Sequence, residues 1–446
     1  MQQILDLHIH SRYSRACSPL LTLENIDSVC RTKGIDIIAT SDFTYPAWFK
    51  SINEELTETF SGSGLYKLKK AIDDKIKFIL STELSLIYKE GDKVRKIHLL
   101  VHAPNIAAAN VLNKQLDRKF NIRSDGRPIL GISAPDLVKL VLKIDPHFLI
   151  YPAHIWTPWF SVFGSKSGFD SLEECFQDQT EHIYAVETGL SSDPEMNWRL
   201  SALDNLTILS SSDAHSLPNI GREANIMELE DLPGYNQIYE VIKNHWKISE
   251  RSLANKNKPA KIGLKSTLEF YPEEGRYYLD GHRDCNFSCL PEKSYSYKNI
   301  CPVCGRPLVI GVLNRVAELA DRPSTYRPEN AVGFKKIVEL DKIIAEALNI
   351  KNRNSVRVQK QYQEIINRFG NELFILLDLD LTKIDFQTDL KVDSRDNFQI
   401  NHKNNHKTVI DVLSRIIKGI EKMRIGKLIV KPGYDGEYGI INIFND

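Results

Sequence analysis

Short apolar runs, rich in Ile, Leu and Val, recur along the first half of the chain. Runs of this length, followed by small or polar residues, are typical of buried strands. Seven such runs occupy residues 3–9, 36–40, 77–81, 97–101, 148–151, 183–187 and 206–210. The pattern therefore predicts seven strands within the first domain, which we expect to cover residues 1–250.

Segments with helical periodicity lie between several of these runs. In residues 22–34 and 133–145, apolar side chains recur three and four residues apart, as they do on one face of a helix. Thr22 and Ser133 are expected to cap these helices, and Gly34 to end the first. Strands that alternate with helices predict an α/β fold, here a parallel barrel.

The second half of the chain has a different organisation. Residues 251–262 are polar and Lys-rich, and we expect a linker there. A cysteine-containing module is expected over residues 263–312, followed by a mainly helical domain over 313–446. Helical patterns in this half cover residues 311–321, 330–350 and 354–370, and a strand–turn–strand pattern closes the chain at 428–444.

Histidine and acidic residues are concentrated where the predicted strands end. The segments read DLHIH (6–10), HLLVH (98–102), PAH (152–154) and SSDAH (211–215). His8 and His10 are two residues apart, so on a strand both imidazoles face the same side. Asp213 and His215 repeat this spacing. Because the ends of barrel strands meet on one face, the segments predict a metal cluster at that face.

Composition is that of a globular protein with two or three domains. The 446 residues are 42% hydrophobic and 26% charged, which is ordinary for soluble proteins. No apolar run approaches the roughly 20 residues that cross a bilayer, and the N-terminus lacks the pattern of a secretory signal. We therefore expect a cytoplasmic protein with no membrane partner.

Charge is distributed unevenly between the two halves. Residues 1–250 carry 26 Lys and Arg against 33 Asp and Glu, a net charge of −7. The remaining residues carry 32 against 25, a net charge of +7. An acidic half with metal ligands joined to a basic half is expected of an enzyme that acts on a polyanion.

Four of the seven cysteines lie close together. The CPVCG sequence that holds Cys301 and Cys304 is typical of a zinc knuckle. Cys285 is the third expected ligand. The fourth position is open between Cys289, which we favour slightly, and His282. One structural zinc ion is therefore expected in the module.

Several longer blocks make the chain resemble one family, endonuclease Q, a group of prokaryotic DNA-repair enzymes. With the histidine segments, these blocks are SDFTYPAWF (41–49), PAHIWTPWFSVFGSKSGFDSLEE (152–174), ETGLSSDPEMNWR (187–199) and PGYDGEYG (432–439). The resemblance implies an irregular seven-stranded barrel of the polymerase-and-histidinol-phosphatase (PHP) type, a zinc module and a mainly helical C-terminal domain. It also implies hydrolysis of the DNA phosphodiester 5′ to a deaminated base or abasic site, which leaves a 3′-hydroxyl and a 5′-phosphate.

The resemblance further implies a cluster of divalent metals, zinc with manganese or magnesium as alternatives. Its ligands would be His8, His10, Asp42, Glu83, His98, His154, Glu187, Asp213 and His215. Glu83 would bridge two metals, and Glu187 would be a ligand or the partner of one. Glu83, His154 and Asp213 are the expected catalytic residues, joined by Asp193, which we expect to contact substrate. Phe43 stands where the family often has a histidine.

An enzyme that acts beside one altered base must take that base out of the stack. The aromatic residues that follow His154 are candidates for the walls of a base pocket, and the serines and lysine after them are candidates for contacts to phosphate or base. Arg222 is a candidate phosphate clamp. The expected substrate-binding residues are thus Trp156, Trp159, Phe160, Ser165, Lys166, Ser167 and Arg222.

DNA, as damaged duplex or single strand, is the expected partner, which would place the protein at the nucleoid. The replication and repair sliding clamp is a further expected partner. The basic C-terminal helices, with Lys351, Arg353, Arg357 and Lys360, would hold the duplex backbone. Two alternatives keep the same residues: a phosphatase of a small phosphate ester, and a DNA-binding scaffold without catalysis.

Overall fold

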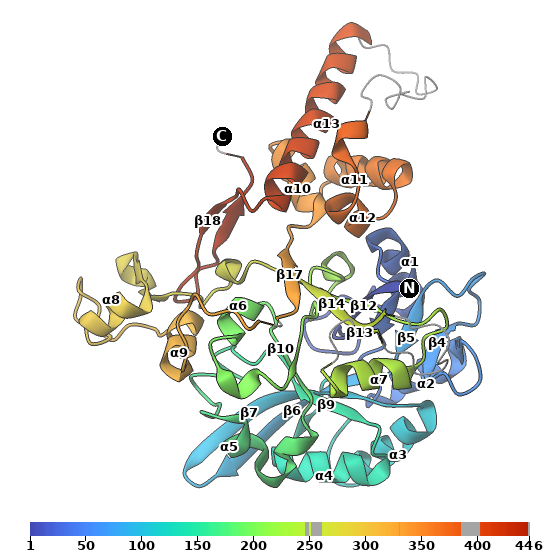
Figure 1. The fold of residues 1–446 in the computed structure, drawn as a ribbon, viewed down its shortest axis with the longest axis vertical. Coiled ribbons are helices and arrows are strands. Elements are labelled where there is room, and N and C mark those ends of the chain that lie inside the picture. The colour runs from blue at the N-terminus through green and yellow to red at the C-terminus, as the bar shows by residue number, and fades with distance from the viewer. Residues whose placement is uncertain (246–248, 251–260, 330, 385–401, 445–446) are drawn as a thin grey trace. The chain divides into compact units, whose positions relative to one another are not determined.

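All seven apolar runs form strands in the computed structural model, which describes residues 1–245, 249–250, 261–329, 331–384 and 402–444 (Figure 1). The chain divides into two compact units. The first comprises Met1–Arg31, Ile35–Lys335 and Pro432–Gly439, and the second Thr32–Gly34, Lys336–Lys431 and Ile440–Asp446. All the histidine segments named above belong to the first unit.

The largest sheet of the first unit is mixed. Its strand order is β13 (Ser249–Glu250), β14 (Lys261–Glu269), β12 (Ala224–Glu228), β1 (Gln2–Asp6), β2 (Ile37–Ala39), β5 (Lys77–Ile79), β4 (Leu65–Leu68) and β3 (Leu56–Glu58), and β17 (Gly333–Lys336) pairs with β14. Pairing is parallel among β1, β2 and β5 and antiparallel from β1 to β12 and β14. Leu5 of β1 and Ile37 and Ile38 of β2 are completely buried in the core, as is the polar residue Asp6 at the end of β1.

Two further sheets complete the strand framework of this unit. One has the order β8 (Ile129–Leu130), β6 (Ser81–Glu90), β7 (Lys93–His102), β9 (Leu149–Pro152), and the other pairs β10 (Ala185–Glu187) with β11 (Thr207–Leu209) in parallel. The expected α/β class is confirmed. The closed seven-stranded barrel stays a prediction, because the seven strands are divided among three sheets and the long β6–β7 hairpin is antiparallel.

The helices of the first unit are α1 (Leu23–Lys33), α2 (Pro46–Glu55), α3 (Ile106–Asp117), α4 (Ala134–Ile144), α5 (Leu172–Phe176), α6 (Pro194–Asn197), α7 (Tyr235–Lys243), α8 (Pro291–Ser296) and α9 (Val312–Leu319). Among them, α1, α4 and α9 correspond to helical patterns that the sequence predicts. Thr22 Oγ1 accepts the Asn25 amide at 3.3 Å, and Ser133 Oγ accepts the Asp136 amide at 3.3 Å. Helices α3, α4 and α5 form a row beneath the β6–β7–β9 sheet (Figure 1).

The cysteine module contains a short hairpin of β15 (Asp280–His282) and β16 (Phe287–Cys289). Its small apolar core consists of Cys289, Cys301 and Leu308. The chain returns to this module near its end, where the Leu279 amide donates to the Gly433 carbonyl at 3.0 Å. A Cβ on Gly281 would lie 2.3 Å from the Tyr434 ring, so the close approach requires glycine.

The second unit is mainly helical. It contains α10 (Leu340–Ala347), α11 (Val356–Phe369), α12 (Glu372–Leu377), α13 (His402–Arg424) and the hairpin of β18 (Ile429–Lys431) and β19 (Ile440–Asn442). Buried Glu372 joins two of these helices, since its carboxylate accepts the Leu340 amide at 3.1 Å and the Tyr362 hydroxyl at 2.6 Å. No helix among the described residues has the length and apolar character needed to cross a membrane.

One helix prediction is wrong in its extent. The pattern at 330–350 predicts a single helix, whereas Gly333–Lys336 forms β17 and the helix α10 covers Leu340–Ala347 alone. Pairing of β17 with β14 satisfies its backbone groups and overrides the local helical periodicity. Most of the expected linker, residues 251–260, lies outside the described residues, and residues 261–262 already belong to β14.

Candidate metal centre

Six of the expected metal ligands gather at one place in the first unit. His8 and His10 follow β1, His154 follows β9 and Asp213 follows β11, so each lies just beyond the carboxyl end of its strand. Glu83 lies in β6 and His98 in β7, which are paired antiparallel in one sheet. The convergence of strand ends that the sequence predicts therefore takes place.

These side chains form two groups that could each hold a metal ion. In the first group the ligand atoms of His8, His10 and Asp213 lie within 4.8 Å of one another. The second group, with the same spacing, is made of Glu83, His98 and His154.

Glu83 connects the two groups. Its Oε2 lies 3.2 Å from His10 Nε2 and 3.6 Å from His8 Nε2, while Oε1 lies 2.6 Å from His98 Nδ1 and 3.1 Å from His154 Nε2. The side chain is completely buried. A carboxylate with one oxygen toward each group has the position of a bridging ligand.

The residues of the first group fit a bound cation. His8 Nε2, His10 Nε2 and Asp213 Oδ1 are buried and form no hydrogen bond of suitable geometry, although His10 Nε2 lies 3.1 Å from Asp213 Oδ1. A buried polar atom left in this way costs about 1–3 kcal/mol, and three such atoms facing one another call for a common partner. Imidazole nitrogen and carboxylate oxygen are the donors that zinc and manganese prefer.

Asp42 orients His10 and is not in either group. Its Oδ1 lies 3.4 Å from His10 Nδ1, and its Oδ2 accepts the Ser11 amide at 2.8 Å, the Ser11 hydroxyl at 2.6 Å and the Ser14 hydroxyl at 2.7 Å. A carboxylate on Nδ1 fixes the imidazole tautomer that presents Nε2 to a metal. Both carboxylate oxygens therefore have partners within the protein, so the geometry favours Asp42 as the partner of a ligand, and its expected role as a ligand stays a prediction.

Glu187 plays the same part for His8. Its Oε2 lies 3.1 Å from His8 Nδ1 and accepts the His154 amide at 2.9 Å, and the carboxylate is completely buried. Of the two expectations for Glu187, ligand or partner of a ligand, the geometry favours the partner.

His215 lies beside the first group without belonging to it. Its Nδ1 is 2.9 Å from the Asp213 carbonyl oxygen, and its ring centroid is 4.5 Å from that of His10. The side chain is 30% exposed. It is therefore the histidine of the centre that faces solvent, where an added ion or substrate can reach it.

The backbone is strained at three residues of the centre. Asp42, His154 and Asp213 all have positive φ angles, at 47°, 31° and 45°, a conformation that costs non-glycine residues energy and is concentrated at functional sites. Gly189, at φ +59°, packs on His154, and a Cβ there would lie 2.3 Å from the His154 Cβ. The surrounding fold thus holds the loop of His154 in place.

Opposite charges determine the ionisation of the centre. Burial alone would lower the pKa of His8, but the carboxylates of Glu187 and Asp213 outweigh burial and raise that pKa well above its usual range. Burial would raise the pKa of Glu83, but the charges around it, above all that of His98, hold it well below its usual range. Protons and metal ions therefore compete for the same imidazole nitrogens.

The aromatic residues after His154 have different environments. Trp156 is 1% exposed, donates from Nε1 to Asn197 Oδ1 at 2.8 Å and packs against the tilted ring of Phe163. It is a core residue, so the expectation that it lines a base pocket is not supported by its position. Trp159 is 43% exposed, and the Phe160 ring lies 4.7 Å from the His98 ring, so these two are the aromatic residues available to a substrate.

The polar residues that follow are also divided between surface and core. Ser165 and Lys166 are exposed. Ser167 is buried, and its hydroxyl donates to the Lys96 carbonyl at 3.2 Å. The loop is anchored from outside by Arg315 of α9, which donates to the carbonyls of Phe163 and Phe169 at 3.1 Å each. Ser167 thus supports the loop, and Ser165 and Lys166 remain available to substrate.

Arg222 and Asp193 have structural contacts. Arg222 donates from Nε to the Ser212 carbonyl at 2.9 Å and from Nη2 to the Asp213 carbonyl at 3.4 Å, which holds the strained Asp213 loop. Asp193 caps α6 by accepting the Met196 amide at 3.0 Å, and it is 4% exposed. In the structure Arg222 thus anchors a loop and Asp193 caps a helix, and their roles as phosphate clamp and substrate contact stay predictions.

Sequence reasoning missed Arg127. Its Nη1 donates to Glu83 Oε2 at 3.0 Å, so a permanent cation lies inside the metal centre. Ser11 and Ser14, which hold Asp42, were also missed, although Ser11 directly follows His10. No pattern in the sequence marks Arg127, because it lies 44 residues from Glu83 and the fold alone brings them together.

The chain matches known proteins along different parts of its length. A family model described as the MJ0043 C-terminal domain matches residues 339–394. The uncharacterised protein MJ0043 of Methanocaldococcus jannaschii is 28% identical over 291 residues, which are 64% of this chain and 31% of that protein, so the chain spans about a third of it. The uncharacterised protein YqxK of Bacillus subtilis is 30% identical over 336 residues, 71% of this chain and 77% of that one.

Solved structures match over the whole chain. The lesion-specific endonuclease PfuEndoQ of Pyrococcus furiosus is 27% identical, with a TM-score of 0.79 over 100% of this chain and 96% of that chain. The chain belongs to the endonuclease Q family. A second endonuclease Q structure, in complex with a 27-mer duplex substrate that has an abasic lesion at the active site, is also 27% identical, with a TM-score of 0.78 over 100% and 97% of the two chains.

The cysteine module of this endonuclease Q family member forms a third group of ligand atoms. It consists of His282, Cys285, Cys301 and Cys304. Cys304 Sγ lies 3.7 Å from His282 Nδ1. Cys289, which the spacing slightly favours, packs in the module core. The geometry therefore favours His282 as the fourth ligand, since the β15–β16 pairing turns Cys289 toward Leu308.

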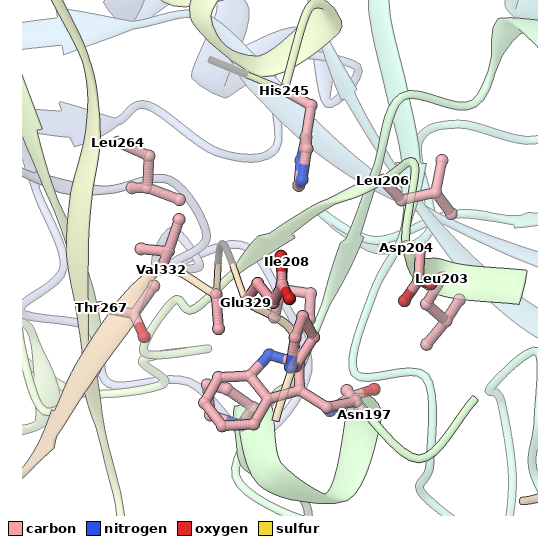
Figure 2. A pocket seen from close by; sticks show the side chains of 14 residues that line it. Asn197, Leu203, Asp204, Leu206, Ile208, His245, Leu264, Thr267, Glu329 and Val332 are labelled. Atoms are coloured by element: carbon pink, nitrogen blue, oxygen red, sulfur yellow. The ribbon is translucent and has the colours of Figure 1, made fainter. Parts of the chain in front are cut away.

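A pocket elsewhere in the first unit has no part in the metal centre. Figure 2 shows it between the α6 region, β14 and the segment before β17. The residues that line it and are labelled there are Asn197, Leu203, Asp204, Leu206, Ile208, His245, Leu264, Thr267, Glu329 and Val332. None of the candidate metal ligands of this endonuclease Q family member is among them.

Proposed function

We propose that the protein is a metal-dependent DNA-repair endonuclease that cleaves the phosphodiester on the 5′ side of a damaged nucleotide. The observation that carries the proposal is the position of Glu83 between two groups of buried ligand atoms. Two adjacent sites of this kind suit phosphodiester hydrolysis, because both the attacking and the leaving oxygen need stabilisation. Membership of the endonuclease Q family supports DNA as the substrate.

The chain's own residues would hold divalent ions in a defined way. His8, His10 and Asp213 would hold one ion and His98 and His154 another, with Glu83 between them. When bound, such ions supply Lewis-acid activation of the attacking water and neutralise phosphate charge. Water adds to phosphorus, the bond from phosphorus to the upstream O3′ breaks, and O3′ takes the proton. The products are a 3′-hydroxyl and a 5′-phosphate on the damaged nucleotide.

Lesion recognition is assigned to the exposed part of the loop after His154. Trp159, Ser165 and Lys166 are exposed on the loop that follows His154, and an aromatic side chain can replace the stacking that a flipped nucleotide loses. We propose deoxyuridine, deoxyinosine and abasic sites as substrates. An abasic complex of a related endonuclease Q supports the last of these.

Partners other than DNA receive less support. The zinc module and the helices of the second unit are proposed to hold the duplex backbone. Arg353, one of the residues expected to do so, is paired with Glu339 at 3.0 Å and Asp341 at 3.4 Å, which leaves Lys351, Arg357 and Lys360 for phosphate. Nothing in the described part of the chain supports a contact with the sliding clamp.

The test is cleavage of end-labelled duplexes that carry deoxyuridine, deoxyinosine or an abasic site, with an undamaged duplex as control. Zinc, manganese and magnesium are added separately. His8→Ala removes a buried candidate ligand, and His147→Ala is the matched control, because His147 is exposed and precedes β9 at the end opposite to His154. We expect a metal-dependent nick 5′ to the lesion in the wild type and in His147→Ala, and none in His8→Ala.

Other outcomes would change the assignment. Intact strands under every metal, with DNA still bound, would refute the nuclease and leave a binding scaffold. Turnover of p-nitrophenyl phosphate without DNA binding would favour a small-molecule phosphatase. Equal nicking by His8→Ala and the wild type would show that the two ligand groups are not the active site.

A further inference from the structure

Arg127 reaches the metal centre from a loop that packs directly on it. The Gly126 amide donates to the Tyr13 carbonyl at 3.0 Å, and a Cβ on Gly126 would lie 2.5 Å from Asp42 Oδ2. The backbone therefore touches the residue that orients His10. From this position the Arg127 guanidinium extends to Glu83, where Nη1 lies 3.0 Å from Oε2.

The Arg127 guanidinium has N–H donors beyond the one that it uses for Glu83. An arginine side chain has five N–H donors, and among the described residues Arg127 uses its side chain for one hydrogen bond, to Glu83. Its side chain is 23% exposed, whereas that of Glu83 is completely buried. Arg222, the other arginine near the centre, differs in this respect, because two of its nitrogens donate to loop carbonyls.

A permanent cation beside a cluster of metal ligands needs an explanation. Arginine stays charged at every pH that proteins experience, so it repels the ions that the imidazoles would hold. That repulsion is offset when an anion joins the site. The guanidinium fork matches two oxygens of a phosphate group, and the Arg127 side chain is partly exposed to solvent.

We propose that Arg127 is a catalytic residue that binds a non-bridging oxygen of the scissile phosphate. The guanidinium then faces the oxygen on which negative charge grows as water adds to phosphorus and the bond to O3′ breaks. The other oxygens of the phosphate remain available to the ions held by the two ligand groups. This inference rests on the proposed function, since it assigns a role within the same phosphodiester hydrolysis.

Three variants test the inference in the full chain. Arg127→Met removes the charge and keeps the length of the side chain, and Arg127→Lys keeps the charge and loses the fork. Arg123→Gln is the matched control, because Arg123 lies in the same loop with a 63% exposed side chain paired to Asp117. Measurements are kcat and KM on lesion duplex, manganese affinity by calorimetry, and affinity of the manganese-loaded protein for thymidine 5′-monophosphate.

We expect Arg127→Met to lower kcat about 100- to 1,000-fold, the usual loss when one transition-state donor is removed. Its affinity for the nucleotide should fall at least about tenfold, while its manganese affinity stays equal or rises. Arg127→Lys should recover part of both losses, and Arg123→Gln should match the wild type.

Two results would overturn the role of Arg127. One is a kcat and nucleotide affinity of Arg127→Met equal to the wild type. The other is a parallel loss of manganese affinity, which would make Arg127 a residue that positions Glu83. If the wild type fails to nick lesion DNA, the proposed function fails by itself, and the nucleotide titration still decides whether Arg127 binds phosphate.

Discussion

Replacing Asp42 by asparagine tests how the centre orients its imidazoles. Asp42 is completely buried, and its Oδ2 accepts three hydrogen bonds from Ser11 and Ser14. An asparagine must therefore place its oxygen at that position and turn its NH2 group toward His10 Nδ1. His10 Nδ1 then accepts a hydrogen bond, so the proton moves to Nε2, the atom that faces Asp213.

The magnitude follows from that change of tautomer. A protonated Nε2 cannot bind a metal ion. To bind one, His10 must move its proton back to Nδ1, which breaks the hydrogen bond from the asparagine NH2 group to Nδ1. Substitution of such outer carboxylates typically weakens metal affinity 10- to 100-fold, or about 1.4–2.7 kcal/mol. The cost to folding should be smaller, because the three hydrogen bonds to the retained oxygen survive.

Manganese and zinc affinities are measured by calorimetry at pH 7.5, with thermal unfolding of the same samples. Asp36→Asn is the matched control. Asp36 precedes the same strand, β2, and its Oδ2 accepts the Ile4 amide at 2.8 Å, but it lies at the opposite end from the centre. Unchanged metal affinity in Asp42→Asn would refute the reasoning, as would an equal loss in Asp36→Asn.

Three further predictions concern other parts of the first unit. His282→Ala should lose the structural zinc, measured by elemental analysis, whereas Cys289→Ala should retain it; the reverse would restore the cysteine as fourth ligand. Burial raises the pKa of Glu269 from 4.5 to about 8, so its contribution to stability is present below pH 4.5 and is lost as the pH rises through 8. Glu269→Gln should therefore unfold at a higher temperature than the wild type at pH 9 and show no such advantage at pH 4.5, and a constant difference would contradict this. Gly189→Ala places a Cβ 2.3 Å from that of His154, and we expect at least a tenfold lower kcat on lesion duplex; a kcat equal to that of the wild type would contradict this.

Local sequence patterns predicted elements correctly where residues close in sequence determine the structure. The seven apolar runs are strands because buried strands consist of such runs, and Thr22 and Ser133 cap their helices because a hydroxyl before a helix accepts an orphan amide. The pattern failed at residues 330–350, where pairing with β14 takes Gly333–Lys336 into a sheet. Helical periodicity carries no information about a distant strand edge.

The candidate ligands were predictable for a similar reason, whereas the roles of the residues that contact those ligands were not. His8, His10, His154 and Asp213 lie just beyond strands and Glu83 lies near the start of β6, and residues at strand ends are where an α/β fold brings side chains together. Imidazole and carboxylate groups gathered in this way are suited to binding cations. The sequence alone thus predicted the α/β class, many of the elements, and six side chains that lie together and could hold metal ions.

Tertiary structure decided which partner each side chain has. The carboxylate of Asp42 orients the His10 imidazole, that of Asp193 caps a helix, and that of Glu83 lies between the two groups of candidate ligands. Arg222 became a loop anchor, while Arg127 reached the centre from 44 residues beyond Glu83. The physical reason is that a carboxylate or guanidinium interacts within about 4 Å, and such distances are fixed by packing between segments far apart in the chain.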